Sequence, residues 1–382
     1  MTGPVVGVVG GGQLARMLAE AATPLGVHLR VLAGPSDEGA PEVVPDTVIG
    51  APDDPDALSA FAATVDVVTF DHENVDHGAL RRLEESGVAV RPSVGTLAFA
   101  DKAHQRRAFR AGGLPVPDFT VLDGGPADVA AAAAFADRHG GSVVVKASRG
   151  GYDGRGVWML GGDELERFVS AWAGAPLVLE PRLALEFEVA VLVARRPSGE
   201  VVTWPVLETV QVGGMCDEVL LPAAVVPELQ TRAREVAHRV ADLTAAVGVI
   251  AVELFVVGGE VLVNEIAPRV HNSGHLTIEG TATSQFEQHL RAVLDWPLGP
   301  TDPVGAGVAM VNVVVEGTVD PRDRQAAALS AVPEAHVHLY GKTTRPGRKV
   351  GHVTVVGADV TASRRRARLA ADLLSGVGGS GA

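Results

Sequence analysis

A lysine followed by a glycine-rich segment is the first feature of this sequence that could carry chemistry. Lys146 ends an apolar stretch, and residues 148–156 then place four glycines among two arginines, Tyr152 and Asp153. Backbone amides of such a loop can close over phosphate groups, and the lysine supplies a compact positive charge. The lysine precedes the glycines, so the segment is not a Walker A motif. The structural alternative is a long hairpin loop, but such loops seldom need Lys, Arg, Tyr and Asp together.

Two glutamates form a second candidate site, because each interrupts an apolar run on one side of a Gly258-Gly259 turn. Pairing the two runs as a hairpin places Glu253 and Glu265 at nearly matching distances from the turn. Two carboxylates that face each other across a ladder repel unless a cation lies between them. With Asn264 adjacent, hard oxygen ligands beside a phosphate loop imply Mg²⁺. A buried salt bridge to arginine is the alternative.

Two polar segments could bind anions. Residues 267–275 follow the second glutamate directly and hold Arg269, His271 and Asn272, which could contact a reacting anion. Residues 342–349 hold four bases in a chain whose 32 basic residues include only four lysines. This concentration favours a phosphate-binding element, although a solvated basic loop is the alternative.

The loop that begins at Gly10 is a weaker candidate. The pattern Gly10-x-Gly12-x-x-Ala15 follows an apolar run and opens a helical pattern, so its amides and helix dipole suit an anion. A dinucleotide site would need an acid at the end of the next strand, and residues 32–34 contain none. A phosphate of another ligand therefore fits better than NAD. A tight strand-to-helix turn is the structural alternative.

Three groups of elements must position these residues. Strand-like runs at 5–9, 28–32, 65–70 and 88–90 alternate with helical patterns, which predicts a parallel, Rossmann-like sheet with its ligand site near residues 10–12 and 70–74. A helix through 102–109, a long helix over about 227–248 and the glutamate hairpin follow. Short strands follow Pro300. We predict domains at 1–95, at 96–298 with a small subdomain at about 115–180, and at 299–382, with a disordered tail from 375.

Composition narrows the class of protein. The net charge of −14 argues against nonspecific nucleic-acid binding, which needs a cationic surface. One cysteine excludes an internal disulfide, and no apolar run approaches the roughly 20 residues that span a bilayer. The first residues show no basic signal-peptide region. These features predict that this chain of 382 residues is a soluble, cytoplasmic protein without a membrane partner.

The sequence resembles the ATP-grasp enzymes, and within them the N5-carboxyaminoimidazole ribonucleotide synthetase family of purine biosynthesis. The resemblance covers almost the whole chain, and the block at 263–275 is its most specific part. It is carried by GGGQLARM at 10–17, RGGYDGRG at 149–156, VNEIAPRVHNSGH at 263–275, SQFEQH at 284–289 and residues 340–352. It implies an α/β and α+β architecture: an N-terminal Rossmann-like parallel-sheet domain, a central ATP-grasp domain and a small C-terminal β-rich domain.

The resemblance also implies an activity and a set of site residues. The family couples ATP cleavage to carboxylation of aminoimidazole ribonucleotide by bicarbonate through carboxyphosphate, releases ADP and phosphate, and suggests a homodimer. Residues implied for ATP are Lys102, Lys146, Gly151, Gly154, Gly156, Glu180 at the adenine hinge, Glu188 at the ribose and Asn264. Residues implied for Mg²⁺ are Glu253 and Glu265. Residues implied for the nucleotide substrate are Gly12, Gln13, Glu73, Tyr152, Asp153, Lys342, Arg348 and Lys349. Residues implied for the bicarbonate reaction are Arg269, His271 and Asn272, with Tyr152 and Asp153.

The sequence departs from the family pattern at four positions. Ala15 replaces a glycine, Phe187 replaces a basic residue, and Thr209 and Gln211 stand where asparagine and histidine are usual. Two other functions compete. Formate-dependent glycinamide ribonucleotide transformylase is another ATP-grasp ligase that activates a one-carbon acid. A catalytically idle nucleotide-binding regulator should have lost a glutamate of the metal pair or a phosphate lysine, and this chain keeps them.

Overall fold

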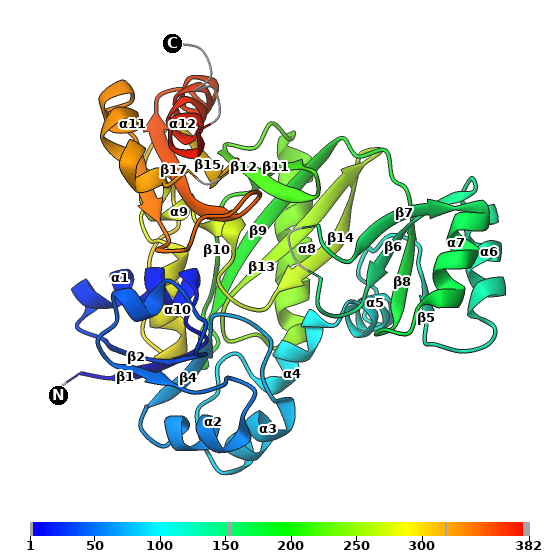
Figure 1. Ribbon diagram of the computed structural model, residues 1–382, viewed down its shortest axis with the longest axis horizontal. Coiled ribbons are helices and arrows are strands. Elements are labelled where there is room, and N and C mark those ends of the chain that lie inside the picture. Colours follow the sequence, from blue (N-terminus) through cyan, green and yellow to red (C-terminus); the bar gives the residue numbers. More distant parts are fainter. Residues whose placement is uncertain (1–2, 152–153, 318, 377–382) are drawn as a thin grey trace.

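The N-terminal part of the chain is a parallel sheet with helices packed on it (Figure 1). The computed structural model describes residues 3–151, 154–317 and 319–376. The strand order is β3-β2-β1-β4, and all pairs are parallel, as predicted. The elements are β1 (Val5–Val9), α1 (Gln13–Leu25), β2 (His28–Ala33), η1 (Ala40–Glu42), β3 (Thr47–Ile49), α2 (Pro55–Ala62), β4 (Val67–Phe70) and α3 (His77–Glu85).

The fourth strand of this sheet is β3, not the strand predicted at residues 88–90. Residues 88–90 form no strand, and Val90 makes only an isolated bridge with Val68. Arg91 still donates to the Val68 carbonyl at 2.9 Å, but Ser93 already caps α4, so the chain leaves the sheet before a further pair can form. The short β3 takes the fourth place instead, at the sheet edge beside β2.

A small antiparallel sheet with order β5-β8-β6-β7 follows, and helices α6 and α7 cover one face of it (Figure 1). Its core contains Phe135, Val145 and Leu179. This region lies within the span predicted for the small subdomain. The elements are α4 (Val94–Leu97), η2 (Ala98–Ala100), α5 (Lys102–Ala111), β5 (Thr120–Leu122), α6 (Asp128–Arg138), β6 (Ser142–Ala147), β7 (Val157–Gly161), α7 (Gly162–Ala171) and β8 (Leu177–Pro181).

The largest sheet has nine strands in the order β14-β13-β9-β11-β12-β15-β17-β16, with β10 paired to β9. The long helix ends at Thr244 rather than near 248, because Ala245 turns into the left-handed region with φ 47° and β13 begins at Gly248. The central elements are β9 (Phe187–Arg195), β10 (Val201–Thr203), β11 (Leu207–Val212), β12 (Met215–Leu221), α8 (Pro227–Thr244), β13 (Gly248–Val257), β14 (Glu260–Ala267), η3 (Asn272–Gly274), α9 (Thr277–Gly280) and α10 (Gln285–Val293).

The C-terminal strands extend this same sheet, since β15 pairs antiparallel with β12. Helix α12 packs on β15 and β17. The elements are β15 (Gly307–Val314), η4 (Pro321–Arg324), α11 (Gln325–Ala331), β16 (His336–Leu339), β17 (Lys349–Gly357) and α12 (Val360–Ser375). Of the predicted disordered tail, Ser375 ends α12 and Gly376 caps it, while 377–382 lie outside the described residues. Among the described helices, none has the length and apolar character to cross a membrane.

Candidate active site

The two glutamates of the central hairpin face each other, as predicted. In the antiparallel ladder of β13 and β14, Glu253 pairs with Glu265, and the register shifts directly after Glu253. The turn uses Gly258 and Gly259 at φ 58° and 75°, a region that glycine enters without strain. Backbone pairing therefore brings two carboxylates to one place on the sheet.

Lys102 and Lys146 reach the β14 side of this hairpin from different elements. The Lys102 amide donates to the carbonyl of Ser148 at 2.9 Å, which holds the start of α5 against the glycine-rich loop. The Lys102 ammonium pairs with Glu265. Lys146, near the end of β6, donates to Asn264 Oδ1 at 3.0 Å. Burial, reinforced by the charge of Lys146, lowers the pKa of Lys102 to about 8.

Glu180 is held by a partner that the sequence analysis missed. Its carboxylate pairs with Arg106 through Oε1 and with Lys146 through Oε2, the latter at 2.8 Å. Burial opposes ionisation of Glu180, but the charges of Lys146 and Arg106 outweigh it and hold the pKa at about 2. Arg106 lies four residues after Lys102 on α5, so helical spacing could have placed it on the same face.

Glu188 on β9 lies beside the same cluster. Burial, and secondly the charge of Glu253, raises the pKa of Glu188 to about 7. One of the unusual residues stands directly opposite it, because Thr209 on β11 is its ladder partner. Gln211 follows the irregularity of β11, and Phe187 packs against the apolar core. Because side chains alternate along a strand, Phe187 lies on the opposite face of β9 from Glu188, whereas Thr209 stands across from Glu188.

The raised pKa of Glu188 predicts a pH-dependent effect on stability. An acid whose pKa rises on folding stabilises the fold at low pH, and this contribution is lost as pH rises from about 4.5 to about 7. Glu188→Gln removes the charge, so the apo variant should melt at a higher temperature than the parent at pH 8. The difference should shrink towards zero at pH 4. Thermal melts in EDTA measure this, and a difference independent of pH would contradict the raised pKa.

The glycine-rich loop connects β6 to β7. Gly150, Gly154 and Gly156 all have positive φ, from 75° to 76°. At Gly154, a Cβ would also lie 3.0 Å from the carbonyl oxygen of Gly213 in the β11–β12 turn. A Cβ at Gly151 would likewise lie too close to the carbonyl oxygen of Arg155. Tyr152 and Asp153, predicted to contact substrate, lie outside the described residues.

The polar loop after β14 joins the glutamate pair directly. His271 Nδ1 lies 3.6 Å from Glu253 Oε1 and 3.0 Å from the Ser273 hydroxyl. Arg269 forms an ion pair with Glu73, with Nε 2.9 Å from Oε1. Burial, followed by the charges of Arg269 and Lys349, lowers the pKa of His271 to about 3, so the imidazole is neutral at pH 7. The loop thus presents a cation and a neutral imidazole together.

Asn272 is fixed by an asparagine that the sequence analysis did not single out. The two carboxamides of Asn272 and Asn312 donate to each other, at 3.0 and 2.8 Å. Asn312 lies on β15 and also donates to the carbonyl of Cys216 at 2.9 Å. A C-terminal strand thereby orients a residue of the central loop.

The predicted phosphate-binding bases differ in the residues that they contact. Lys342 donates to the side chain of Gln13 at the start of α1, and the Nε2 atoms of Gln13 and His275 are 3.4 Å apart. Lys349 is buried, and its charge acts on both His271 and His275. Arg348 instead pairs with Glu38 at 2.7 Å. The two lysines therefore reach the polar loop, whereas Arg348 is neutralised beside it.

The Gly10 loop is already occupied by carboxylates of the protein itself. The amide of Gly11 donates to Asp37 at 2.7 Å, and that of Ala15 donates to Asp71 at 2.8 Å. A Cβ at Gly12 would lie 2.3 Å from Asp71 Oδ2, so only glycine fits there. Asp37 also accepts from the Gly34 amide at 2.8 Å, so its carboxylate ties the segment after β2 to the Gly10 loop. These contacts favour the strand-to-helix turn over a free phosphate site.

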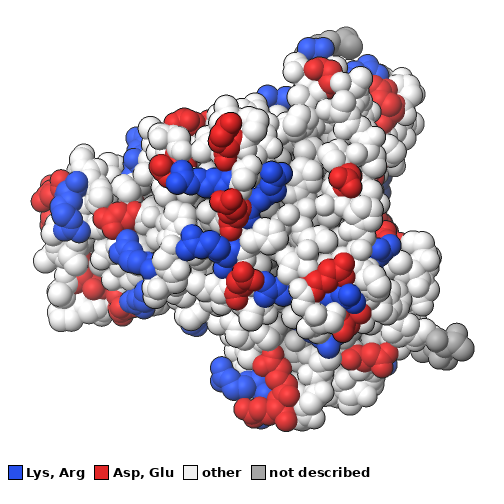
Figure 2. Space-filling view, turned by 180° about the vertical axis from the view of Figure 1, so that it is seen from behind, with Lys and Arg blue, Asp and Glu red and all other residues white. Residues whose placement is uncertain are grey.

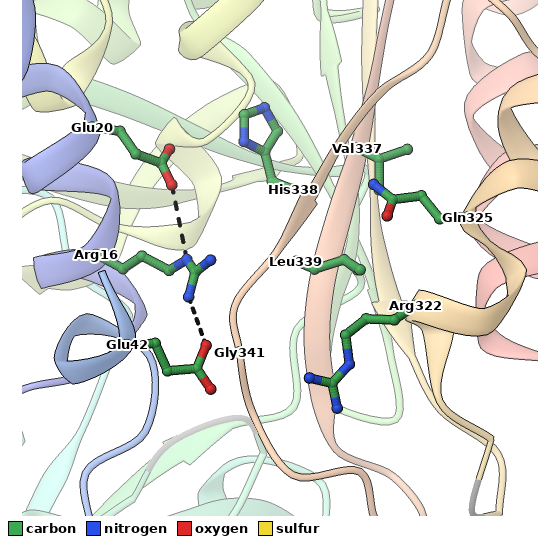
Figure 3. A pocket seen from close by; sticks show the side chains of 9 residues that line it. All are labelled: Arg16, Glu20, Glu42, Arg322, Gln325, Val337, His338, Leu339 and Gly341. Carbon is green, nitrogen blue, oxygen red and sulfur yellow. Dashed lines mark hydrogen bonds and ion pairs between the residues drawn. The ribbon is translucent and has the colours of Figure 1, made fainter. Parts of the chain in front are cut away.

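A cavity of about 350 Å³ opens between α1 and the C-terminal segment that carries β16 (Figure 3). Arg16 lies between Glu20 and Glu42, at 3.9 and 3.1 Å, so its charge is balanced. None of the predicted site residues lines the cavity. Figure 2 shows basic and acidic side chains interspersed over the face it presents.

Three family models match consecutive parts of the chain. Residues 4–101 match the ribonucleotide synthetase preATP-grasp domain. Residues 107–286 match the ATP-grasp domain. Residues 308–366 match the phosphoribosylaminoimidazole carboxylase C-terminal domain.

Individual proteins match over nearly the full length. An N5-carboxyaminoimidazole ribonucleotide synthase of Mycobacterium tuberculosis is 47% identical, with 97% of this chain and 88% of the relative covered. The crystal structure of the carboxyaminoimidazole ribonucleotide synthase of Aspergillus clavatus complexed with ATP has a TM-score of 0.89 at 32% identity, covering 98% and 99%. The same enzyme in complex with ADP and 5-aminoimidazole ribonucleotide has a TM-score of 0.87 at 31% identity, covering 97% and 98%.

Proposed function

Because this chain belongs to the N5-carboxyaminoimidazole ribonucleotide synthase family of ATP-grasp ligases, we propose that the residues above form one site for ATP, bicarbonate and aminoimidazole ribonucleotide. The enzyme forms N5-carboxyaminoimidazole ribonucleotide from aminoimidazole ribonucleotide with ATP, in purine biosynthesis. The observation that carries the proposed site is the 3.6 Å contact of His271 with Glu253. It joins the phosphate-binding cluster to the loop that carries the anion-binding side chains.

In this proposal, ATP lies between the small sheet and the glutamate hairpin. Lys102, Lys146 and the glycine-rich loop bind its phosphates, Glu180 supports the adenine end, and Glu188 accepts hydrogen bonds from the ribose when ionised. The ATP-bound crystal structure of the Aspergillus clavatus relative supports nucleotide binding.

Glu253 and Glu265 would hold Mg²⁺, with Asn264 beside them. Among the described side chains, no group of three His, Cys, Asp or Glu converges closely enough to hold a metal ion. Mg²⁺ usually binds through one or two carboxylates plus substrate phosphates, so a pair of glutamates fits an ion that arrives with ATP. The ion would neutralise charge on the phosphates. In this structure Lys102 supplies the cation at Glu265.

Bicarbonate would be activated beside the 269–272 loop. One of its oxygens attacks the γ-phosphorus, ADP leaves, and carboxyphosphate forms. The substrate amine then attacks the carbon, forming the N–C bond and releasing phosphate. Positioning and charge neutralisation account for most catalysis of phosphoryl transfer. Arg269 and the neutral His271 are suited to orient the anion, with Asn272 held by Asn312.

The nucleotide substrate would lie against Gly12, Gln13 and Glu73, with its phosphate near Lys342 and Lys349. Arg348 would act at longer range, since Glu38 already pairs with it. Tyr152 and Asp153 keep the substrate-binding roles that the resemblance implies. The crystal structure of the Aspergillus clavatus relative with ADP and 5-aminoimidazole ribonucleotide supports a shared site.

Three further points belong to the proposal. The protein forms a homodimer in this proposal, because the family resemblance suggests one. Its proposed cytoplasmic location is inferred from composition. The domain bounds 1–95, 96–298 and 299–382 stay predictions from the sequence.

ADP release tests the reaction. We expect ADP release to rise when both aminoimidazole ribonucleotide and bicarbonate are added to the protein with Mg²⁺ and ATP. A coupled assay for ADP measures it, and glycinamide ribonucleotide with formate is the control pair for the competing ligase. Stimulation by the control pair alone would overturn the proposal.

A further inference from the structure

The SQFEQH segment at 284–289 contains polar side chains that the proposed reaction leaves unexplained. Ser284 caps α10 by accepting from the Glu287 amide, and the helix begins at Gln285. Gln285, Gln288 and His289 are all fully buried. Burying a carboxamide is unfavourable unless its donors and acceptor are hydrogen-bonded, so each must have specific partners.

Gln285 takes its partners from the proposed bicarbonate loop. Its Oε1 accepts from the His271 amide at 2.9 Å, and its Nε2 donates to the His271 carbonyl at 2.7 Å. Only this orientation of the carboxamide sets an acceptor against N–H and a donor against C=O. One side chain thereby fixes both polar groups of the His271 main chain.

The same carboxamide contacts the far end of the loop. Nε2 lies 3.0 Å from His275 Nδ1, and the ring nitrogen accepts this hydrogen bond because a carboxamide nitrogen can only donate. Burial holds the pKa of His275 well below its usual value, which keeps the ring neutral. Gly274 lies between these two histidines and packs directly against the Gln285 carboxamide. A Cβ at position 274 would lie 2.2 Å from Gln285 Oε1. The main-chain amide of Gln285 also donates to Thr277 at 2.8 Å. Gln285 is thus packed along the loop.

We propose that Gln285 is a positioning residue for the bicarbonate step. It holds the main chain of His271, which lies between Arg269 and Asn272, and so sets where these side chains meet the anion. This inference rests on the proposed function. Misplacement of reacting groups by about 1 Å can lower a rate by about 10²-fold, which makes such a clamp kinetically important.

Gln288 is a matched control on the same helix. It accepts from the Gly299 amide and donates to the Gly299 carbonyl, both at 2.8 Å. It therefore makes the same pair of main-chain hydrogen bonds as Gln285 and is equally buried, but its partner lies in the segment before β15. A purely structural role predicts similar consequences for both residues.

The experiment compares Gln285→Leu with Gln288→Leu in the full-length enzyme. Both should lower the melting temperature, and both should keep ADP affinity within about threefold, because neither touches the lysine–glutamate cluster. Gln285→Leu should lower kcat/KM for bicarbonate by about 10²-fold. Gln288→Leu should keep kcat/KM for bicarbonate within about threefold of the parent. The rates are measured below the melting transition and divided by the concentration of protein that binds ADP.

Equal losses of kcat/KM in the two variants, or no loss in Gln285→Leu, would overturn the proposal. If a leucine variant does not fold, Gln285→Glu and Gln288→Glu decide, because a carboxylate keeps the acceptor and loses the donors. Gln285→Glu should then be at least about tenfold slower with bicarbonate than Gln288→Glu, and equal rates would refute the positioning role. Failure of the proposed function is distinct, since the parent enzyme itself would then show no bicarbonate-dependent ADP release.

Discussion

Glu265→Gln is expected to lower ATP-dependent turnover by about 10³-fold while the protein stays folded. The exchange keeps the size of the side chain and removes one charge of the proposed Mg²⁺ pair. Loss of metal-assisted charge stabilisation amounts to several kcal/mol, and each 1.36 kcal/mol corresponds to about tenfold in rate. Glu253→Gln should act similarly, because the two carboxylates are ladder partners. Steady-state ADP release at saturating substrates measures the effect.

Glu260→Gln is the matched control for this prediction. Glu260 lies on the same strand, is exposed, and pairs with Arg232 at 3.0 Å, so its contribution should be small. We expect its turnover to stay within about twofold of the parent. Thermal melts should show that all three variants fold. Near-parental turnover in both Glu265→Gln and Glu253→Gln would show that these carboxylates are not metal ligands.

Lys349→Ala is expected to raise the KM for aminoimidazole ribonucleotide by about 10- to 150-fold. A charge-assisted hydrogen bond contributes about 1.5–3 kcal/mol, which corresponds to that range in binding. Lys349 is buried at the start of β17, and its charge reaches His271 and His275. The KM for ATP should change little, because the lysines proposed for ATP are Lys102 and Lys146.

The selectivity of the Lys349→Ala variant makes the test specific. If Lys349 binds the 5′-phosphate, the variant should discriminate less between the nucleotide and its dephosphorylated riboside. Arg345→Ala is the control, since Arg345 is an exposed base in the same segment. Full preference for the phosphorylated substrate, together with weaker ATP binding, would assign Lys349 to the ATP site instead.

The sequence by itself determined those features that depend on local pattern. The Gly258-Gly259 turn and the two apolar runs were sufficient to place Glu253 and Glu265 within one register step of each other, because a two-residue hairpin sets the register beside its turn. The register shift directly after Glu253, which makes the two glutamates direct partners, was visible only in the structure. Alternating strands and helices predicted the N-terminal parallel sheet, and glycines among basic residues marked the loop after Lys146. The prediction failed at residues 88–90 and at the short β3, because three-residue patterns carry little periodicity.

Only the tertiary structure decided which distant residues hold the site in place. Arg106 meets Glu180 across 74 positions, and Asn272 meets Asn312 across 40. The C-terminal strands join the central sheet through β12 and β15, which the change in composition after Pro300 did not reveal. Gln285 and Asp37 were likewise identified by their partners alone. Each of these contacts is a hydrogen bond or ion pair between separate elements, and its existence depends on how sheets and helices pack, which no local periodicity encodes.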